Sequence, residues 1–139
     1  MSMEKVIEEV KNVLYQEQTV SSAYLFGSIA KGRYRADSDL DIAVLFVPGL
    51  NKLKRFELRL ELMGLLEEIC QRRVDLIDLL EAPLFLQHQV RKYGKLIVEK
   101  DHAYRVRYEV QSRREYFDLQ PVLERRQRAL LKGFVKDSL

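Results

Sequence analysis

A glycine-serine pair followed by closely spaced aspartates forms the part of this sequence whose residue types are suited to chemistry. Gly27-Ser28 is separated by ten residues from Asp39-x-Asp41. Gly27 lets the backbone turn with no side chain in the way, so amides and the Ser28 hydroxyl at the start of a following helix can donate to a phosphate. Asp39 and Asp41 alternate with Leu40 on a predicted strand, so their carboxylates point to the same face, about 6.5 to 7 Å apart along the chain.

Carboxylates at this spacing predict a pair of bound metal ions. Two divalent ions about 3.5 to 4 Å apart clamp the attacking and leaving oxygens in phosphoryl or nucleotidyl transfer, and hard oxygen ligands favour Mg²⁺. Asp75 lies on the next predicted strand, where we expect it to bring a third carboxylate to the same edge of the sheet. Because three carboxylates without a cation repel one another and raise one another's pKa values, such a cluster is expected to serve metal binding and not stability.

Two other motifs begin in the same stretch, but residues that they require are missing. A P-loop requires Lys followed by Ser or Thr where Arg33-Tyr34 stand, so a Walker-type NTPase is excluded. A calcium loop starting at Asp37 requires Gly where Ile42 stands and Glu where Pro48 stands. An ordinary turn followed by surface carboxylates remains the alternative, but it leaves the conjunction of the glycine-serine turn, the aspartate pair and the later aspartate unexplained.

The elements that must position these residues follow from the hydrophobic pattern. Helices between strands predict a mixed α/β (α+β) domain in which a small mixed sheet is packed with helices and followed by a C-terminal helical arm. A break in the arm is expected near Pro121, which would give two helices or one kinked helix. The predicted strands are 23–26, 40–47, 73–79 and 96–98; the predicted helices are 2–18, 51–70, 83–94 and 101–139.

Two of these helices carry recognisable start signals. Ser2 is expected to cap the first helix and Asn51 the second. The second helix is predicted to cover one face of the sheet with a stripe of apolar side chains. The stripe is Leu53, Phe56, Leu60 and Met63, widened by Leu62, Leu66 and Ile69.

Length and composition bound the remaining possibilities. The chain of 139 residues is expected to form a single domain, with a core of about residues 1–100 and the helical arm at about 101–139. The longest apolar run, Ile42–Val47, is far shorter than the roughly 20 residues of a membrane span. With no signal-peptide pattern and a single cysteine, Cys70, the sequence is typical of a cytoplasmic protein.

The formal charge of +3 comes from the tail. Residues 101–139 hold 9 Lys and Arg against 6 Asp and Glu, which accounts for the whole excess. A weak basic excess permits contact with an acidic partner without demanding it. A nucleic-acid partner is therefore compatible with the sequence but not favoured.

The pattern Gly27-Ser28, ten residues, Asp39-x-Asp41 and then Asp75 resembles the DNA polymerase beta-like nucleotidyltransferase superfamily, and the short chain is similar to its minimal nucleotidyltransferase (MNT) branch. The resemblance implies a polymerase beta-like fold in which Asp39 and Asp41 bind both metal ions. Asp75 would complete the site and help to activate the attacking hydroxyl, while Gly27-Ser28 would hold the nucleotide triphosphate. Ser38 matches the Ser-Asp-x-Asp form common in this branch.

The resemblance also implies a partner and a reaction. The segment Arg114–Pro121 is similar to one found in minimal nucleotidyltransferases encoded beside HEPN-domain toxins. This implies an antitoxin that uses Mg²⁺ and ATP to transfer AMP to a tyrosine hydroxyl of a cognate HEPN ribonuclease. Lys31 and Arg33 are candidates for neutralising the triphosphate. The alternatives are an antitoxin that only covers the toxin surface and a small-molecule (aminoglycoside-type) nucleotidyltransferase, which the short length disfavours.

Overall fold

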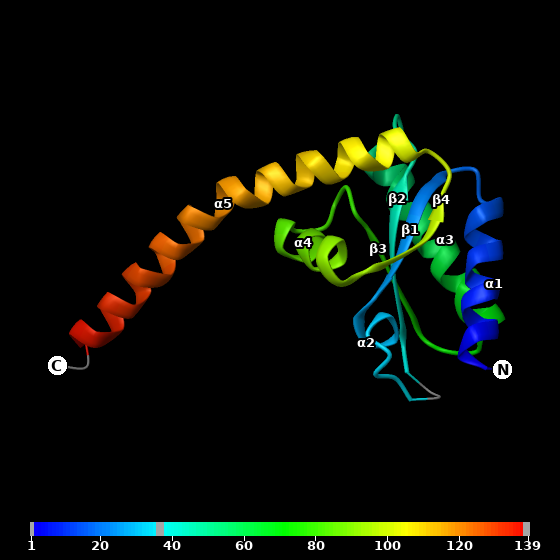
Figure 1. The fold of residues 1–139 in the computed structure, drawn as a ribbon, viewed down its shortest axis with the longest axis horizontal. Helices are drawn as coiled ribbons and strands as arrows, with labels where there is room; N and C mark the ends of the chain where they lie inside the picture. The colour runs from blue at the N-terminus through cyan, green and yellow to red at the C-terminus, as the bar shows by residue number, and fades with distance from the viewer. Residues whose placement is uncertain (1, 36–37, 138–139) are drawn as a thin grey trace.

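Four strands form one sheet with helices on both faces in a computed structural model that describes residues 2–35 and 38–137 (Figure 1). Asp37, the first residue of the calcium-loop alternative, lies outside the described residues. None of the described helices combines the length and the hydrophobicity that crossing a bilayer requires. The strands are β1 (Val20–Phe26), β2 (Leu40–Phe46), β3 (Val74–Asp78) and β4 (Lys95–Glu99); the helices are α1 (Met3–Gln16), α2 (Gly27–Ala30), α3 (Lys52–Cys70), α4 (Leu84–Tyr93) and α5 (His102–Asp137).

The sheet is mixed, as the sequence predicted. Its strand order is β3-β2-β1-β4, with β1 antiparallel to both β2 and β4, and β2 parallel to β3. The parallel pair requires a crossover, which α3 supplies. As a result, β2 lies inside the sheet with β1 on one side and β3 on the other.

The predicted helix starts are confirmed. The Ser2 hydroxyl accepts a hydrogen bond from the Lys5 N–H at 3.2 Å, and Asn51 Oδ1 accepts one from the Lys54 N–H at 2.8 Å. Each cap satisfies a backbone donor that the helix itself leaves unpaired, which stabilises a helix by about 1 kcal/mol. The arm is one helix: α5 continues through Pro121, and the two-helix alternative is wrong.

The two faces of the sheet bury two separate cores. Along β2, Ile42, Val44 and Phe46 pack into the core under α1 and α3. The intervening Ala43 and Leu45 pack on the other face, where α4 and α5 lie (Figure 1). Because side chains alternate along a strand, Asp41 belongs to the α4 and α5 face.

The predicted buried stripe of α3 is partly wrong. The side chains of Leu53, Phe56 and Leu60 are at least half exposed, at 66%, 50% and 50%. The helix instead packs through a neighbouring stripe at four-residue spacing. Apolar residues occur on nearly every side of α3, so periodicity alone does not select the side that packs on the sheet. The residues that are buried are Leu58, Leu62, Leu66 and Cys70.

Candidate functional site

Asp41 and Asp75 lie opposite each other on neighbouring strands. The parallel register pairs Asp41 of β2 directly with Asp75 of β3. Residues paired in this way carry their side chains on the same face of the sheet. Asp39 comes immediately before β2 and has the same parity as Asp41. The sheet thus brings the three predicted aspartates together at the end where β2 and β3 begin.

The Gly27 turn lies directly against Asp41. Phe26, the last residue of β1, pairs with Asp41, so Gly27 follows at the same level of the sheet. Gly27 has a φ of +73°, a conformation that disfavours any residue with a side chain. A Cβ built on Gly27 would overlap Asp41 Oδ2. Gly27 therefore serves two purposes, since it turns the chain and leaves room for the carboxylate.

The short helix α2 is anchored on the core beside this turn. Ile29 is buried in the core that α1 and α3 cover. The Arg33 N–H donates to the carbonyl of Ser28 at 2.9 Å, which fixes the exit from α2. Ser28 itself is half-buried at the start of the helix. Ser28 follows the glycine turn at the start of α2, as the sequence predicted, and contact of its hydroxyl with a phosphate stays a prediction.

Every effect that shifts the pKa of the Asp41 carboxyl raises it. Burial raises the pKa of the Asp41 carboxyl above its ordinary value of 3.8, and the charges of Asp75 and Asp39 raise it further. Asp41 is half-buried, whereas Asp39 and Asp75 are exposed. A cation bound among the three would relieve this repulsion.

The candidate ligands suit a hard divalent cation, although they do not enclose a binding site. All the candidate ligands are carboxylate oxygens, which suit Mg²⁺. Within residues 2–35 and 38–137, no three His, Cys, Asp or Glu side chains are already arranged to hold a metal ion. The three aspartates are neighbours in the sheet and not a closed cage, so their role as metal ligands stays a prediction.

Ser38 closes the loop that leads into the aspartate pair. Its hydroxyl accepts a hydrogen bond from the Arg35 N–H at 2.7 Å, and its carbonyl accepts one from Arg72 Nη1 at 3.3 Å. These contacts fix the position of Ser38 just before β2 begins. A role for Ser38 in nucleotide binding stays a prediction.

Lys31 and Arg33 line a hollow beside α2. The hollow measures about 550 Å³ and is completed by Gln89 and Tyr93 of α4. Lys31 Nζ lies 5.4 Å from the centre of the Tyr93 ring, within the range of a cation–π contact. The two basic candidates thus border one open space next to the Gly27 turn.

Gln89 and Tyr93 were missed by the sequence analysis. Neither forms part of a motif, and both lie on a helix remote in sequence from the glycine-serine turn. The one available signal was Val90, whose apolar side chain packs on the face of the sheet that Asp41 shares. Helical spacing from Val90 would have placed Tyr93 on an adjoining side of α4.

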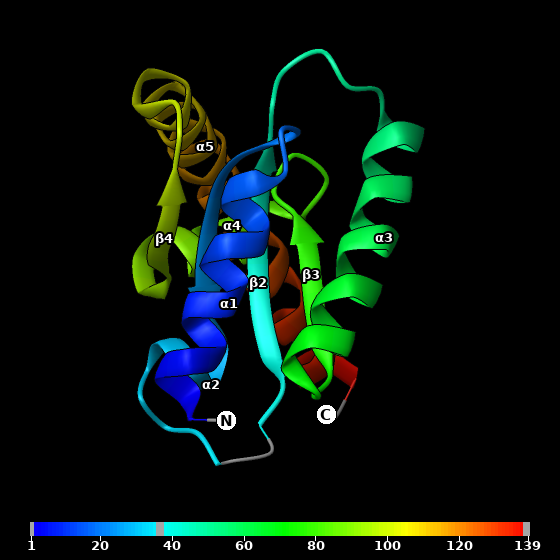
Figure 2. The same ribbon diagram turned by 90° about the vertical axis from the view of Figure 1, so that its right-hand side faces the viewer.

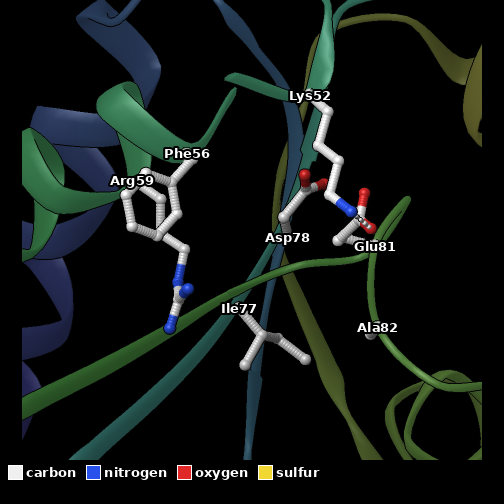
Figure 3. A pocket seen from close by; sticks show the side chains of 7 residues that line it. All are labelled: Lys52, Phe56, Arg59, Ile77, Asp78, Glu81 and Ala82. Carbon is white, nitrogen blue, oxygen red and sulfur yellow. Dashed lines mark ion pairs between the residues drawn. The ribbon is translucent and has the colours of Figure 1, made fainter. Parts of the chain in front are cut away.

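A different hollow lies at the far end of β3. It measures about 190 Å³ and lies beside Asp78, the last residue of the strand, whereas Asp75 is near its start (Figure 3). Its rim is held by ion pairs between Lys52 and Glu81 at 3.0 Å and between Arg55 and Asp78 at 2.7 Å. None of the predicted site residues lines this hollow.

Comparison with known proteins gives consistent matches. The chain is 36% identical over 91 residues to the protein adenylyltransferase MntA of Shewanella oneidensis; the match covers 66% of this chain and 60% of that protein, less than two thirds of its length. A solved toxin-antitoxin structure with AMP-PNP contains a chain that superimposes with a TM-score of 0.70 and 27% identity, over 96% of this chain and 99% of that one. A structure of a tri-AMPylated HEPN toxin of Shewanella oneidensis with an MNT antitoxin gives a TM-score of 0.67 and 26% identity over the same shares.

The family model described as polymerase beta, nucleotidyltransferase, matches residues 8–103. This range contains β1 to β4, the Gly27 turn and all three aspartates. The mixed sheet with its flanking helices is the fold that the sequence resemblance implied. On these grounds, the chain belongs to the polymerase beta nucleotidyltransferase family.

Proposed function

We propose that this chain is a Mg²⁺-dependent protein adenylyltransferase antitoxin that transfers AMP from ATP to a tyrosine hydroxyl of a cognate HEPN ribonuclease toxin and so neutralises it. The observation that carries the proposal is the placement of Asp41 against the Gly27 turn and in register with Asp75. The named activity of the Shewanella oneidensis relative and the AMPylated toxin in the matching complex support it.

The reaction is an in-line displacement at the α-phosphorus of ATP. The tyrosine oxygen forms a bond to the α-phosphorus, and the bond from that phosphorus to the bridging oxygen of the β-phosphate breaks. Pyrophosphate leaves with the electron pair. Asp75, one of the two exposed carboxylates of the cluster, is the candidate acceptor for the proton of the hydroxyl. The protein forms no covalent intermediate, so it acts through positioning and electrostatics.

Asp39, Asp41 and Asp75 are the residues that would hold the metal. Bound Mg²⁺ would supply positive charge that stabilises the charge developing during the transfer. Burial, followed by the charges of Asp75 and Asp39, raises the pKa of Asp41, which is consistent with a site that holds a cation. Gly27 keeps this carboxylate in place by leaving no side chain in its way.

The nucleotide would lie between the Gly27-Ser28 turn and the basic hollow. Lys31 and Arg33 line that hollow, where their charges would meet the triphosphate. Ser38 would fix the loop between the turn and the aspartates. We assign the activity to residues 1–139 as one nucleotidyltransferase domain with a core of about 1–100 and a helical arm of about 101–139, acting in the cytoplasm.

Mass spectrometry tests the proposal directly. The product of the neighbouring gene, which we expect to be the cognate HEPN protein, is incubated with this protein, Mg²⁺ and each nucleoside triphosphate. An AMP adduct on a tyrosine is expected with ATP, and none with a variant carrying both Asp39→Asn and Asp41→Asn. An unmodified toxin, or an adduct that persists with the variant, would contradict the assignment.

Neutralisation by surface occlusion is the second candidate. It is kept because the three aspartates are not arranged as a closed metal site in the described part of the chain. The same double variant separates the two mechanisms. If it still binds and silences the ribonuclease, occlusion is the mechanism; if it binds but no longer silences, chemistry is required.

A further inference from the structure

The first half of α5 packs on α4 through one side of the helix. Tyr108 OH donates to Gln87 Oε1 at 3.1 Å, and the buried Ser112 hydroxyl donates to the same oxygen at 2.7 Å. One turn further along, the Tyr116 ring stacks on His88 with 4.1 Å between the ring centroids. These contacts, four residues apart, identify the side of α5 that faces α4.

After α4 has ended, the same side of α5 carries three leucines, with Arg126 among them. At 3.6 residues per turn, Leu119, Leu123 and Leu130 continue the line of Tyr108 and Ser112; we call these three leucines the inner stripe. Leu119 is half-buried, whereas Leu123 is 43% and Leu130 75% exposed. Among the described residues, no element covers the outer part of this stripe. An amphipathic helix with an uncovered apolar side is stabilised by a partner.

The inner stripe and the aspartates lie on the same side of the sheet. Asp41 shares the sheet face of Ala43 and Leu45, on which α4 and α5 pack. The outer half of α5 projects beyond α4 on this side, and its end descends to the level at which β2 begins (Figures 1 and 2). A protein held along the inner stripe would therefore stand in front of the aspartates.

We propose that the protein acceptor docks on the inner stripe through a helix of its own. The docking face of that helix carries acidic side chains and apolar side chains that pack on the leucines. The inference rests on the proposed function, because it names where the AMP-accepting toxin is held. A hydroxyl acceptor on a macromolecule needs binding contacts outside the reacting centre to be positioned. The stripe supplies such contacts at a distance from the nucleotide.

Charge selects this occupant over the alternatives. Residues 119–133 hold four basic residues and one acidic residue. The one ion pair within this stretch, Arg128 with Glu124, is long at 4.0 Å and exposed, so it neutralises little. Two copies of such an arm would repel each other, which disfavours a second copy of this chain. Exposed leucines are buried by protein side chains and not by a nucleic-acid backbone, which disfavours RNA or DNA.

The test is a matched pair of variants of the full chain. Leu123→Glu with Leu130→Glu places two charges in the inner stripe, whereas Phe117→Glu places one on the nearly opposite side of α5, where Phe117 is 64% exposed. Affinity for the neighbouring-gene HEPN protein is measured by titration calorimetry, and circular dichroism checks that both variants fold. We expect the double variant to bind at least tenfold more weakly and Phe117→Glu to bind within twofold of the wild type.

Kinetics add a readout that a structural defect would not give. The double variant should raise the KM for the toxin by the same factor as its Kd, with kcat and the KM for ATP unchanged. Unchanged affinity of the double variant, or equal loss from Phe117→Glu, would overturn the proposal. So would a wild-type dimer that the double variant dissociates in light scattering, or wild-type binding to RNA that it abolishes.

Failure of this inference is distinguishable from failure of the proposed function. Asp41→Asn should bind the HEPN protein like the wild type, because Asp41 is not part of the stripe. If the wild type binds through the stripe but leaves no AMP adduct, the docking surface stands and the adenylyltransferase assignment falls. If AMP transfer occurs and the double variant leaves affinity and the KM for the toxin unchanged, the assignment stands and the docking surface falls.

Discussion

Replacing Gly27 by alanine should destabilise the protein in two separable ways. Gly27 and Gly32 have nearly the same φ, +73° and +71°. A Cβ at Gly32 would have nothing within 4 Å, whereas a Cβ at Gly27 would overlap Asp41 Oδ2. Gly32→Ala therefore measures the backbone strain alone, and Gly27→Ala measures the strain together with the displacement of Asp41.

The magnitudes follow from these two contributions. An L-residue in the left-handed region costs about 1 to 2 kcal/mol, and forcing a neighbour out of its place costs about 1 to 3 kcal/mol more. Gly32→Ala should thus lower the free energy of unfolding by about 1 to 2 kcal/mol and Gly27→Ala by about 2 to 5 kcal/mol. For a chain of this size, each kcal/mol lowers Tm by roughly 3 to 5 °C.

Chemical denaturation of both variants, in the wild-type and Asp41→Ala backgrounds, isolates the overlap. With alanine at position 41, the carboxylate is gone and the Gly27→Ala cost should fall to that of Gly32→Ala. In the wild-type background, displacement of Asp41 should also slow AMP transfer by about 100-fold, the usual effect of a small misplacement of a reacting group. Equal costs for the two glycines in the wild-type background would refute the placement of Asp41 against the turn.

Three further predictions concern the charge cluster and the helices. In EDTA, Asp41→Asn should raise Tm at pH 7, because a raised pKa means that the ionised carboxylate destabilises the fold. The gain in Tm should shrink as pH falls toward 3.8, the ordinary pKa of an aspartate. In thermal melts, Mg²⁺ with ATP should stabilise only the wild type. Gly64→Ala, in the interior of α3 with open space around its Cβ, should add about 0.5 to 1 kcal/mol to the free energy of unfolding in urea titrations, and a loss would contradict the described geometry. Ser112→Ala removes the buried hydroxyl that pairs with Gln87 Oε1 and Arg91 Nε, and it should lower the free energy of unfolding by about 1 to 3 kcal/mol in the same titrations. The control Ser2→Gly, at an exposed helix cap, should change that free energy by no more than about a few tenths of a kcal/mol.

Local signals were enough to predict most elements. The serine and asparagine caps, the Pro83 helix start and the run Leu40–Val47 correspond to the observed boundaries within a residue or two. The strand β1 was predicted too short, since it begins at Val20 and not at Ala23. Ser21 and Ser22 are buried in β1, and polar residues inside a strand conceal it from a reading based on apolar runs.

The sequence was a poorer guide to which side of each helix packs on the rest of the protein. Both the predicted stripe and the observed stripe of α3 repeat at helical spacing, and only contact with β3 and α1 determines which is buried. The course of α5 through Pro121 likewise depends on more than the local preference of proline, since α5 packs on α4 through Tyr108, Ser112 and Tyr116 before it reaches that residue. Tertiary contacts override weak local preferences in both cases.

By itself, the sequence predicted which residues are candidates for the chemistry, because a glycine-serine turn and alternating aspartates are local patterns that need only a strand to orient them. The tertiary structure decided what these residues meet. It placed Asp75 in register with Asp41, laid Gly27 against the carboxylate, and put α4 and the arm of α5 on the face that the aspartates share. The physical reason is that strand pairing and helix packing join residues far apart in the chain, and no spacing along the sequence encodes those distances.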